Sequence, residues 1–293
     1  MKKKLKIKKL NLIIIILSII LSTIIIINIP TIITLVKNTE LTPEEKILNK
    51  KLKQLNNIDK KVKYFNYNKI DRYLDYKKKN KKLSNKQIVI NVNINLDQEP
   101  YKNTTETTYL HKNYILVNKY HHLSEHYIPN NLEQINSIYT KGNVTLTKEA
   151  KDSFEKMAEA ATKDNLSIIA FSGYRDYIYQ KNLYNKYVEQ DSKEKADTYS
   201  ARPGYSEHQT GLTVDIYNGT IDYNKFDQTK EYQWLQENAH KYGFILRYPQ
   251  DKEQETLYQY ESWHYRYVGI DIATYIKKHN ISFEEYYVTN IEN

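Results

Sequence analysis

The 293-residue sequence predicts an α+β fold, because helical and strand-like patterns are mixed without a regular βαβ rhythm. Residues 150–161 place apolar side chains at helical spacing on one face, and Thr147 precedes them as a helix N-cap. Residues 244–248 and 263–268 are short and strand-like. We therefore expect a small, mostly antiparallel sheet flanked by helices.

Other elements follow from the same patterns. We expect a strand at 167–171, a helix to about residue 189, a helix over 231–242 that ends at Gly243, and an amphipathic helix over 270–278. Residues 88–96 alternate apolar side chains with asparagine, which predicts a half-buried strand. We place the start of the folded domain at this strand.

The N-terminus predicts a membrane anchor. Residues 1–9 contain six lysines, and residues 10–36 carry no charge. As a helix these 27 residues span ~40 Å, more than the ~30 Å bilayer core. A cleaved signal peptide would have a shorter apolar run followed by small residues, whereas no alanine occurs before Ala150. We expect an uncleaved single-pass anchor, with the lysines in the cytoplasm and the remainder outside the cell.

Charge is divided unevenly along the chain. Residues 1–86 hold 22 Lys/Arg against 6 Asp/Glu, whereas the remainder holds 22 against 29. A nucleic-acid enzyme would carry its basic surface on the folded domain, so we expect no nucleic-acid partner. We divide the chain into a basic cytoplasmic tail, a transmembrane anchor, a Lys/Asn-rich helical stalk and a folded domain, namely residues 1–9, 10–36, 37–87 and 88–293. The oligomeric state is left open.

The sequence contains no cysteine, so any transition-metal site must use His, Asp or Glu. His208, Asp215 and His264 could hold zinc and leave its fourth position to water. Asp215 lies in an apolar run, where burial is costly without a metal or a donor. Glu261 could take a proton beside such a site. A histidine taken alone is more often structural or exposed than a ligand, Asp215 alone could cap a turn or pair with a lysine, and Glu261 and His264 could be a surface pair. The spacing is also not that of a helical HExxH motif.

Five separated motifs together resemble the VanY-type D-alanyl-D-alanine carboxypeptidase family and occur in its order. They are Ser172-Gly-Tyr-Arg, Tyr199-Ser-Ala-Arg-Pro-Gly-Tyr-Ser-Glu-His-Gln-Thr-Gly, Val214-Asp-Ile, Tyr242-Gly-Phe-Ile-Leu-Arg-Tyr-Pro and Tyr260-Glu-Ser-Trp-His-Tyr-Arg-Tyr-Val-Gly. The resemblance covers about residues 88–280, including the segments Val117-Asn-Lys119 and Tyr127-Ile-Pro129.

The resemblance implies the fold shared by zinc DD-peptidases and the Hedgehog signalling domain. It implies one zinc ion per chain on His208, Asp215 and His264, with Glu261 as the general base. It also implies that Arg175 contacts the substrate carboxylate or the developing oxyanion. Residues expected to border the substrate are Ser206 and Gln180.

The implied activity is hydrolysis of the C-terminal D-amino acid of peptidoglycan stem peptides. An LD-carboxypeptidase that trims tetrapeptide stems would use the same motifs, and a non-catalytic wall-binding domain is the alternative from another class. Two positions depart from the family, which has glycine where this chain has Leu257 and proline where it has Ser262. Neither change removes a catalytic group.

Overall fold

The computed structural model describes residues 41–292, which fall into two compact units divided between Asn57 and Ile58. In the first unit, helix α2 spans Pro43–Gln54. Its N-terminus forms a capping box, because Thr42 Oγ1 accepts from the Glu45 amide at 3.2 Å and Glu45 Oε2 accepts from the Thr42 amide at 2.7 Å. The expected membrane segment, residues 10–36, lies outside the described residues. Every helix within 41–292 is too short or too polar to span a membrane.

The second unit begins with helices α3 (Ile70–Lys79) and α4 (Asn85–Asn93), which pack on each other. The predicted strand at 88–96 is therefore wrong. The alternating asparagines are not a solvent-facing edge, because Asn91 and Asn93 are buried and hydrogen-bonded within the unit. Asn93 accepts from the Tyr73 hydroxyl at 2.8 Å and donates to the Tyr64 carbonyl at 2.8 Å. Residues 58–87, which are part of the predicted stalk, belong to the same compact unit as the residues from 88 onward.

A four-stranded antiparallel sheet forms the centre of this unit, in the order β5-β6-β8-β7. The strands are Ile169–Ser172, Thr213–Tyr217, His264–Tyr267 and Phe244–Leu246. Two small sheets precede it, one parallel (β1, Thr105–Glu106, with β2, His121–His122) and one antiparallel (β3, Leu132–Gln134, with β4, Thr145–Thr147). The α+β class and the predominance of antiparallel pairing are confirmed.

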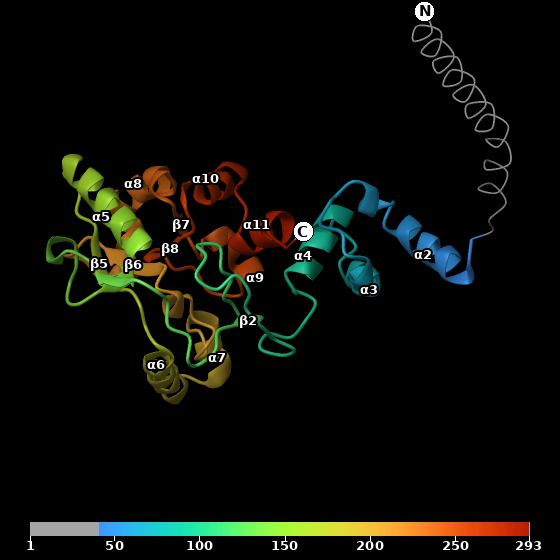
Figure 1. The fold of residues 1–293 in the computed structure, drawn as a ribbon, viewed down its shortest axis with the longest axis horizontal. Coiled ribbons are helices and arrows are strands. Elements are labelled where there is room, and N and C mark those ends of the chain that lie inside the picture. Colours follow the sequence, from blue (N-terminus) through green and yellow to red (C-terminus); the bar gives the residue numbers. More distant parts are fainter. Residues whose placement is uncertain (1–40, 293) are drawn as a thin grey trace, which may run out of the picture. The chain divides into compact units, whose positions relative to one another are not determined.

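Helices follow β4 along the chain, and the first of them shares an apolar core with strand β6 of the central sheet (Figure 1). They are α5 (Lys148–Lys163), α6 (Tyr177–Gln190), α7 (Lys193–Tyr199), α8 (Lys230–Asn238), α9 (Glu253–Thr256), α10 (Ile270–His279) and α11 (Phe283–Asn290). The face predicted for α5 is confirmed, since its buried residues are Ala150, Phe154, Met157, Ala158 and Ala161. These side chains share one apolar core with Val214 and Ile216 of β6.

Strand β6 determines where the site lies. Successive side chains of a strand point to opposite faces, so Asp215 points away from the core that Val214 and Ile216 enter. Asp215 is the pairing partner of Ser172 on β5 and of His264 on β8. Three polar side chains thus form a row across neighbouring strands, on the face of the sheet that borders a cleft.

Candidate metal centre

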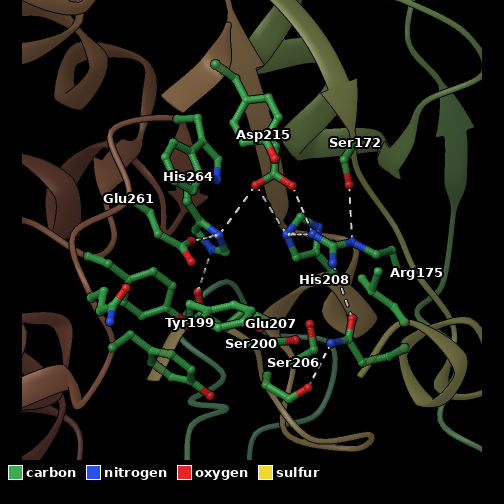
Figure 2. Close-up of a pocket in the computed structure, with 18 of the residues that line it drawn as sticks. Ser172, Arg175, Tyr199, Ser200, Ser206, Glu207, His208, Asp215, Glu261 and His264 are labelled. Atoms are coloured by element: carbon green, nitrogen blue, oxygen red, sulfur yellow. Dashed lines mark hydrogen bonds and ion pairs between the residues drawn. The ribbon is translucent and has the colours of Figure 1, made fainter. Parts of the chain in front are cut away.

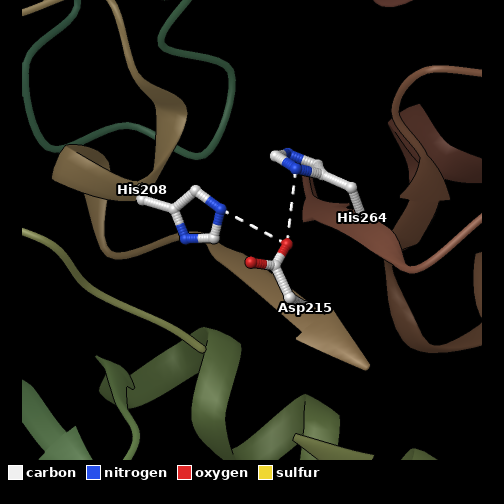
Figure 3. Close-up of side chains that lie close together, drawn as sticks. All are labelled: His208, Asp215 and His264. Carbon is white, nitrogen blue, oxygen red and sulfur yellow. Dashed lines mark ion pairs between the residues drawn. The ribbon is translucent and has the colours of Figure 1, made fainter. Parts of the chain in front are cut away.

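His208, Asp215 and His264 meet at the base of a cleft of about 540 Å³ (Figure 2). One ligand atom from each lies within 4.8 Å of the others, and all three side chains are buried. Asp215 Oδ1 is 3.3 Å from Nε2 of His208 and 3.4 Å from Nδ1 of His264 (Figure 3). The three residues that the sequence singled out as metal ligands are therefore brought together.

Two glycines hold His208 in place. His208 lies in the short 3-10 turn Glu207–Thr210, which ends at Gly211 in the left-handed region with φ of 68°. A Cβ at Gly173 would lie 2.4 Å from the carbonyl oxygen of Thr145, so only glycine allows this close approach. The Gly173 carbonyl is 2.6 Å from His208 Nδ1 and can only accept a hydrogen bond. His208 therefore carries its proton on Nδ1 and presents the Nε2 lone pair to the cleft.

The residues fit a zinc ion on three grounds. Oδ1 of Asp215 is buried and has no hydrogen-bond partner among the described residues, although it lies between two imidazole nitrogens. Nε2 of His208 is free of the ring proton. The donor set of two imidazoles and one carboxylate matches a catalytic zinc site that keeps one position open.

The charges of the group also suit a metal. Burial and the Arg175 guanidinium lower the pKa of His208 to about 4, so its imidazole is neutral at pH 7. Burial raises the pKa of Asp215, but His208 and Arg175 outweigh burial and hold this pKa well below its usual range. A neutral imidazole and an ionised carboxylate are the forms that bind a metal.

His264 must lose a proton before it can bind a metal. Burial lowers its pKa, but the carboxylates of Glu207, Glu261 and Asp215 outweigh burial and raise the pKa to about 9. We therefore expect zinc affinity to increase ~tenfold per pH unit between pH 6 and 8, with about one proton released per ion bound. Competition titrations with a chelator of known affinity, corrected for its own protonation, measure this slope. Affinity that is independent of pH would contradict the protonated state of His264.

Glu261 lies beside the centre. Its Oε2 is 3.1 Å from Nδ1 of His264, and its side chain borders the cleft. Burial raises the pKa of Glu261, and the nearby His264 only partly offsets this. A carboxylate whose pKa is raised next to the metal ligands is better suited to accept and return a proton than one with an ordinary pKa. The structure thus places the Glu261 carboxylate beside the three grouped side chains, at the edge of the cleft.

Arg175 contacts the same group from the other side. Nη2 donates to Asp215 Oδ2 at 2.9 Å and lies 2.5 Å from Nε2 of His208. Its Nε donates to Ser172 Oγ at 3.2 Å, and its Nη1 donates to Gln180 Oε1 at 3.3 Å. Arg175 thus places a guanidinium group against His208 and Asp215.

The two residues expected to border the substrate differ in what they can do. The hydroxyl of Ser206 lines the cleft and makes no hydrogen bond within the described part of the chain, so it can contact a substrate. Both ends of the Gln180 amide are in use, because Oε1 accepts from Arg175 and Nε2 donates to the Ala201 carbonyl at 2.8 Å. Gln180 therefore holds Arg175 and the loop that leads to Ser206.

Leu257 stands where the resemblance to the family led us to expect glycine. It adopts the left-handed region, with φ of 62°, where a side chain costs about 1–2 kcal/mol and glycine does not. Its carbonyl accepts a hydrogen bond from the buried Lys119 ammonium. This hydrogen bond therefore ties down the loop that leads to Glu261, although leucine takes the place of the expected glycine. Ser262 is also buried and leaves Glu261 in the cleft.

Sequence reasoning assigned no role to Glu207. This carboxylate is buried behind His264, with Oε2 3.8 Å from Nε2 of the imidazole. Its position between Ser206 and His208 could have drawn attention to it, because a charged residue within a buried motif needs partners for its charge.

Comparison with known proteins agrees with this geometry. Residues 143–270 match the family described as VanY, D-alanyl-D-alanine carboxypeptidase. A D-alanyl-D-alanine carboxypeptidase of Enterococcus faecium is 41% identical over 145 residues, which cover 49% of this chain and 44% of that protein. This chain spans about half the length of the D-alanyl-D-alanine carboxypeptidases of Enterococcus faecium and Enterococcus faecalis that it matches.

Two solved structures are similar in fold and sequence. The LdcB LD-carboxypeptidase has a TM-score of 0.55 and 40% identity, over 59% of this chain and 85% of that one. A mutant of the vancomycin resistance D,D-pentapeptidase VanY from a VanB-type cassette, in complex with Zn(II), has a TM-score of 0.52 and 34% identity, over 59% of this chain and 98% of that one.

Within residues 41–292, the fold and the site define a class, that of α+β proteins with a His-Asp-His group that could hold a metal at the base of a cleft. This chain also matches nearly the whole length of a solved VanY structure, so the class can be narrowed to one family. The chain belongs to the VanY D-alanyl-D-alanine carboxypeptidase family.

Proposed function

We propose that the chain is a zinc-dependent D-alanyl-D-alanine carboxypeptidase that removes the C-terminal D-amino acid from peptidoglycan stem peptides. The observation that carries the proposal is the convergence of His208, Asp215 and His264 beside Glu261 in one cleft. Family membership and the activity named for the enterococcal relative support it. A non-catalytic wall-binding domain would have no need to bring all four groups together.

The ligands would hold one zinc ion, with Nε2 of His208, Nδ1 of His264 and a carboxylate oxygen of Asp215 as donors. When bound, zinc supplies Lewis acidity, which polarises a carbonyl and lowers the pKa of water. Glu261 takes a proton from the attacking water and later delivers it to the leaving amine, a role that its raised pKa suits.

Arg175 and Ser206 act on the substrate in this proposal. A carboxypeptidase must recognise a free terminal carboxylate, and a guanidinium binds carboxylates through paired N–H donors. Arg175 donates to Asp215 in the present structure, so a metal held by Asp215 would compete with it and free this arginine to face the substrate. The Ser206 hydroxyl can then add a neutral donor on the same side of the cleft.

An LD-carboxypeptidase is the second candidate, supported by the similarity to LdcB. The DD-enzyme cuts between two D-residues at the end of a pentapeptide stem, whereas the LD-enzyme cuts after the L-residue of a tetrapeptide stem. The two substrates carry the same terminal D-amino acid and differ in the residue on the other side of the scissile bond. The four groups at the centre can serve either reaction.

We expect full-length protein loaded with zinc to convert pentapeptide muropeptides into tetrapeptides with release of D-alanine. Mass spectrometry of defined penta- and tetrapeptide muropeptides, incubated separately, measures this. Conversion of tetrapeptide to tripeptide alone would assign the LD activity instead. Absence of any cleavage by a zinc-loaded, folded protein would contradict both assignments and favour a binding domain.

We also propose that residues 10–36 anchor the protein in the cell membrane, with the enzyme outside the cytoplasm. The uncharged run after six lysines supports this placement, which brings the enzyme to the cell wall. Retention of full-length protein in the membrane fraction after a high-salt wash would agree with it, and release of a shortened form would favour a cleaved signal peptide.

A further inference from the structure

A buried cluster of four charged side chains lies behind His264. Glu207, Arg247, Arg266 and Glu284 are each no more than 2% exposed. They come from the turn that carries His208, from the end of β7, from β8 and from α11. The two positive and two negative charges balance each other. Buried charges are costly unless each one is paired with an opposite charge.

Within this cluster, one carboxylate oxygen of Glu207 makes no hydrogen bond. Glu207 Oε1 accepts from Arg247 Nε at 2.9 Å and from Arg266 Nη1 at 2.8 Å. Arg247 is also held by both oxygens of Glu284, at 2.9 Å and 2.5 Å. Arg266 completes its bonds on backbone carbonyls, including that of Ile115 at 2.7 Å. The second oxygen of Glu207 takes no part in any of these contacts.

That oxygen faces the metal ligand. Within the described residues, Glu207 Oε2 and His264 Nε2 are both buried and both lack a hydrogen-bond partner, and they lie 3.8 Å apart. A carboxylate accepts and an imidazole N–H donates, so each is the partner that the other needs. On the opposite edge of the same ring, Nδ1 points to Asp215 Oδ1 at 3.4 Å.

We propose that Glu207 is a positioning residue that keeps the ring proton of His264 on Nε2 and thereby leaves the Nδ1 lone pair for the metal. The proposal rests on the proposed function, in that His264 is taken as a zinc ligand. Carboxylates that hold ligand imidazoles in this way fix the tautomer and ring orientation. His208 uses the Gly173 carbonyl for the same purpose but presents the other nitrogen.

The two arginines make the Glu207→Gln substitution informative. Both guanidinium groups donate to Oε1, so the amide oxygen of glutamine takes that place. The amide NH₂ then faces Nε2 of His264, which must accept instead of donate. The ring proton moves to Nδ1, which is the atom that the metal needs. Zinc affinity falls although no ligand has been removed.

The test compares zinc affinities of full-length wild type, Glu207→Gln and Glu284→Gln by competition with a chromophoric chelator. Glu284→Gln is the matched control, because it also removes one buried carboxylate paired with Arg247 but does not face His264. We expect about a 10–100-fold loss of affinity for Glu207→Gln. For Glu284→Gln we expect affinity close to wild type, with both variants folded by circular dichroism and thermal unfolding.

The outcomes separate this proposal from the proposed function. Folded Glu207→Gln with wild-type affinity, or equal losses in both variants, would overturn the positioning role while His264→Ala still reports the metal site. Failure of wild type to bind zinc would overturn both. Should Glu207→Gln not fold, ¹⁵N NMR of histidine-labelled, zinc-loaded wild type decides. A proton on Nε2 of His264 supports the role, and a proton on its Nδ1 overturns it.

Discussion

Glu261→Ala should retain zinc and the native fold while kcat falls ~10²–10⁴-fold, the usual contribution of general acid–base catalysis. The substitution removes the carboxylate that lies 3.1 Å from His264 Nδ1 but none of the three metal ligands. Zinc content and D-alanine release, measured on the same samples, test both halves of this expectation. Activity should also be lost in Glu261→Gln, because an amide has nearly the shape of the carboxylate but cannot take a proton.

Glu253→Gln provides a matched control for this loss. Glu253 is an exposed carboxylate in the segment that leads to Glu261, and its Oε1 accepts from the Tyr260 amide at 2.6 Å. A glutamine oxygen can keep that bond, so turnover should stay near wild type. If Glu261→Ala retains more than about a tenth of wild-type activity, the assignment of Glu261 as general base is wrong even where the metal site stands.

Asp215→Ala should lose zinc and activity together, which distinguishes a ligand from a base. Its Oδ1 lies between the two imidazoles, so its removal leaves two protein donors. The loss of zinc affinity should exceed the ~10–100-fold typical of residues that only support a ligand. Equilibrium dialysis followed by metal analysis measures it, and Glu261→Ala, from the same cleft, is the control that keeps its metal.

The alternative role for Asp215 is that of a buried counter-ion for Arg175, which it contacts at 2.9 Å. That role predicts lower stability with unchanged zinc content, since removal of one partner leaves a buried charge uncompensated. Thermal unfolding with and without zinc separates the two. Zinc should raise the melting temperature of wild type but not of Asp215→Ala. An equal zinc-dependent shift in both proteins would rule out Asp215 as a ligand.

The sequence predicted the elements whose signal is local. Helix α5 is an example, because five apolar residues at helical spacing face one core. It failed at α4, where isoleucine and asparagine alternate as in a strand. The asparagines are buried by partners that are distant in the sequence, such as the Tyr73 hydroxyl on α3. Periodicity cannot tell a polar residue exposed to water from one that is buried with a partner.

The sequence alone limited the candidate metal ligands to His, Asp and Glu, because the absence of cysteine and the donor atoms of each side chain are properties of the residues themselves. Only the tertiary structure decided how these residues act. His208 and His264 are 56 positions apart, and the pairing of β6 with β8 brings them to one carboxylate. Which nitrogen each presents depends on Gly173 for one and on Glu207 for the other. These contacts form between residues that only the fold brings together. The spacing of residues along the chain therefore does not predict them.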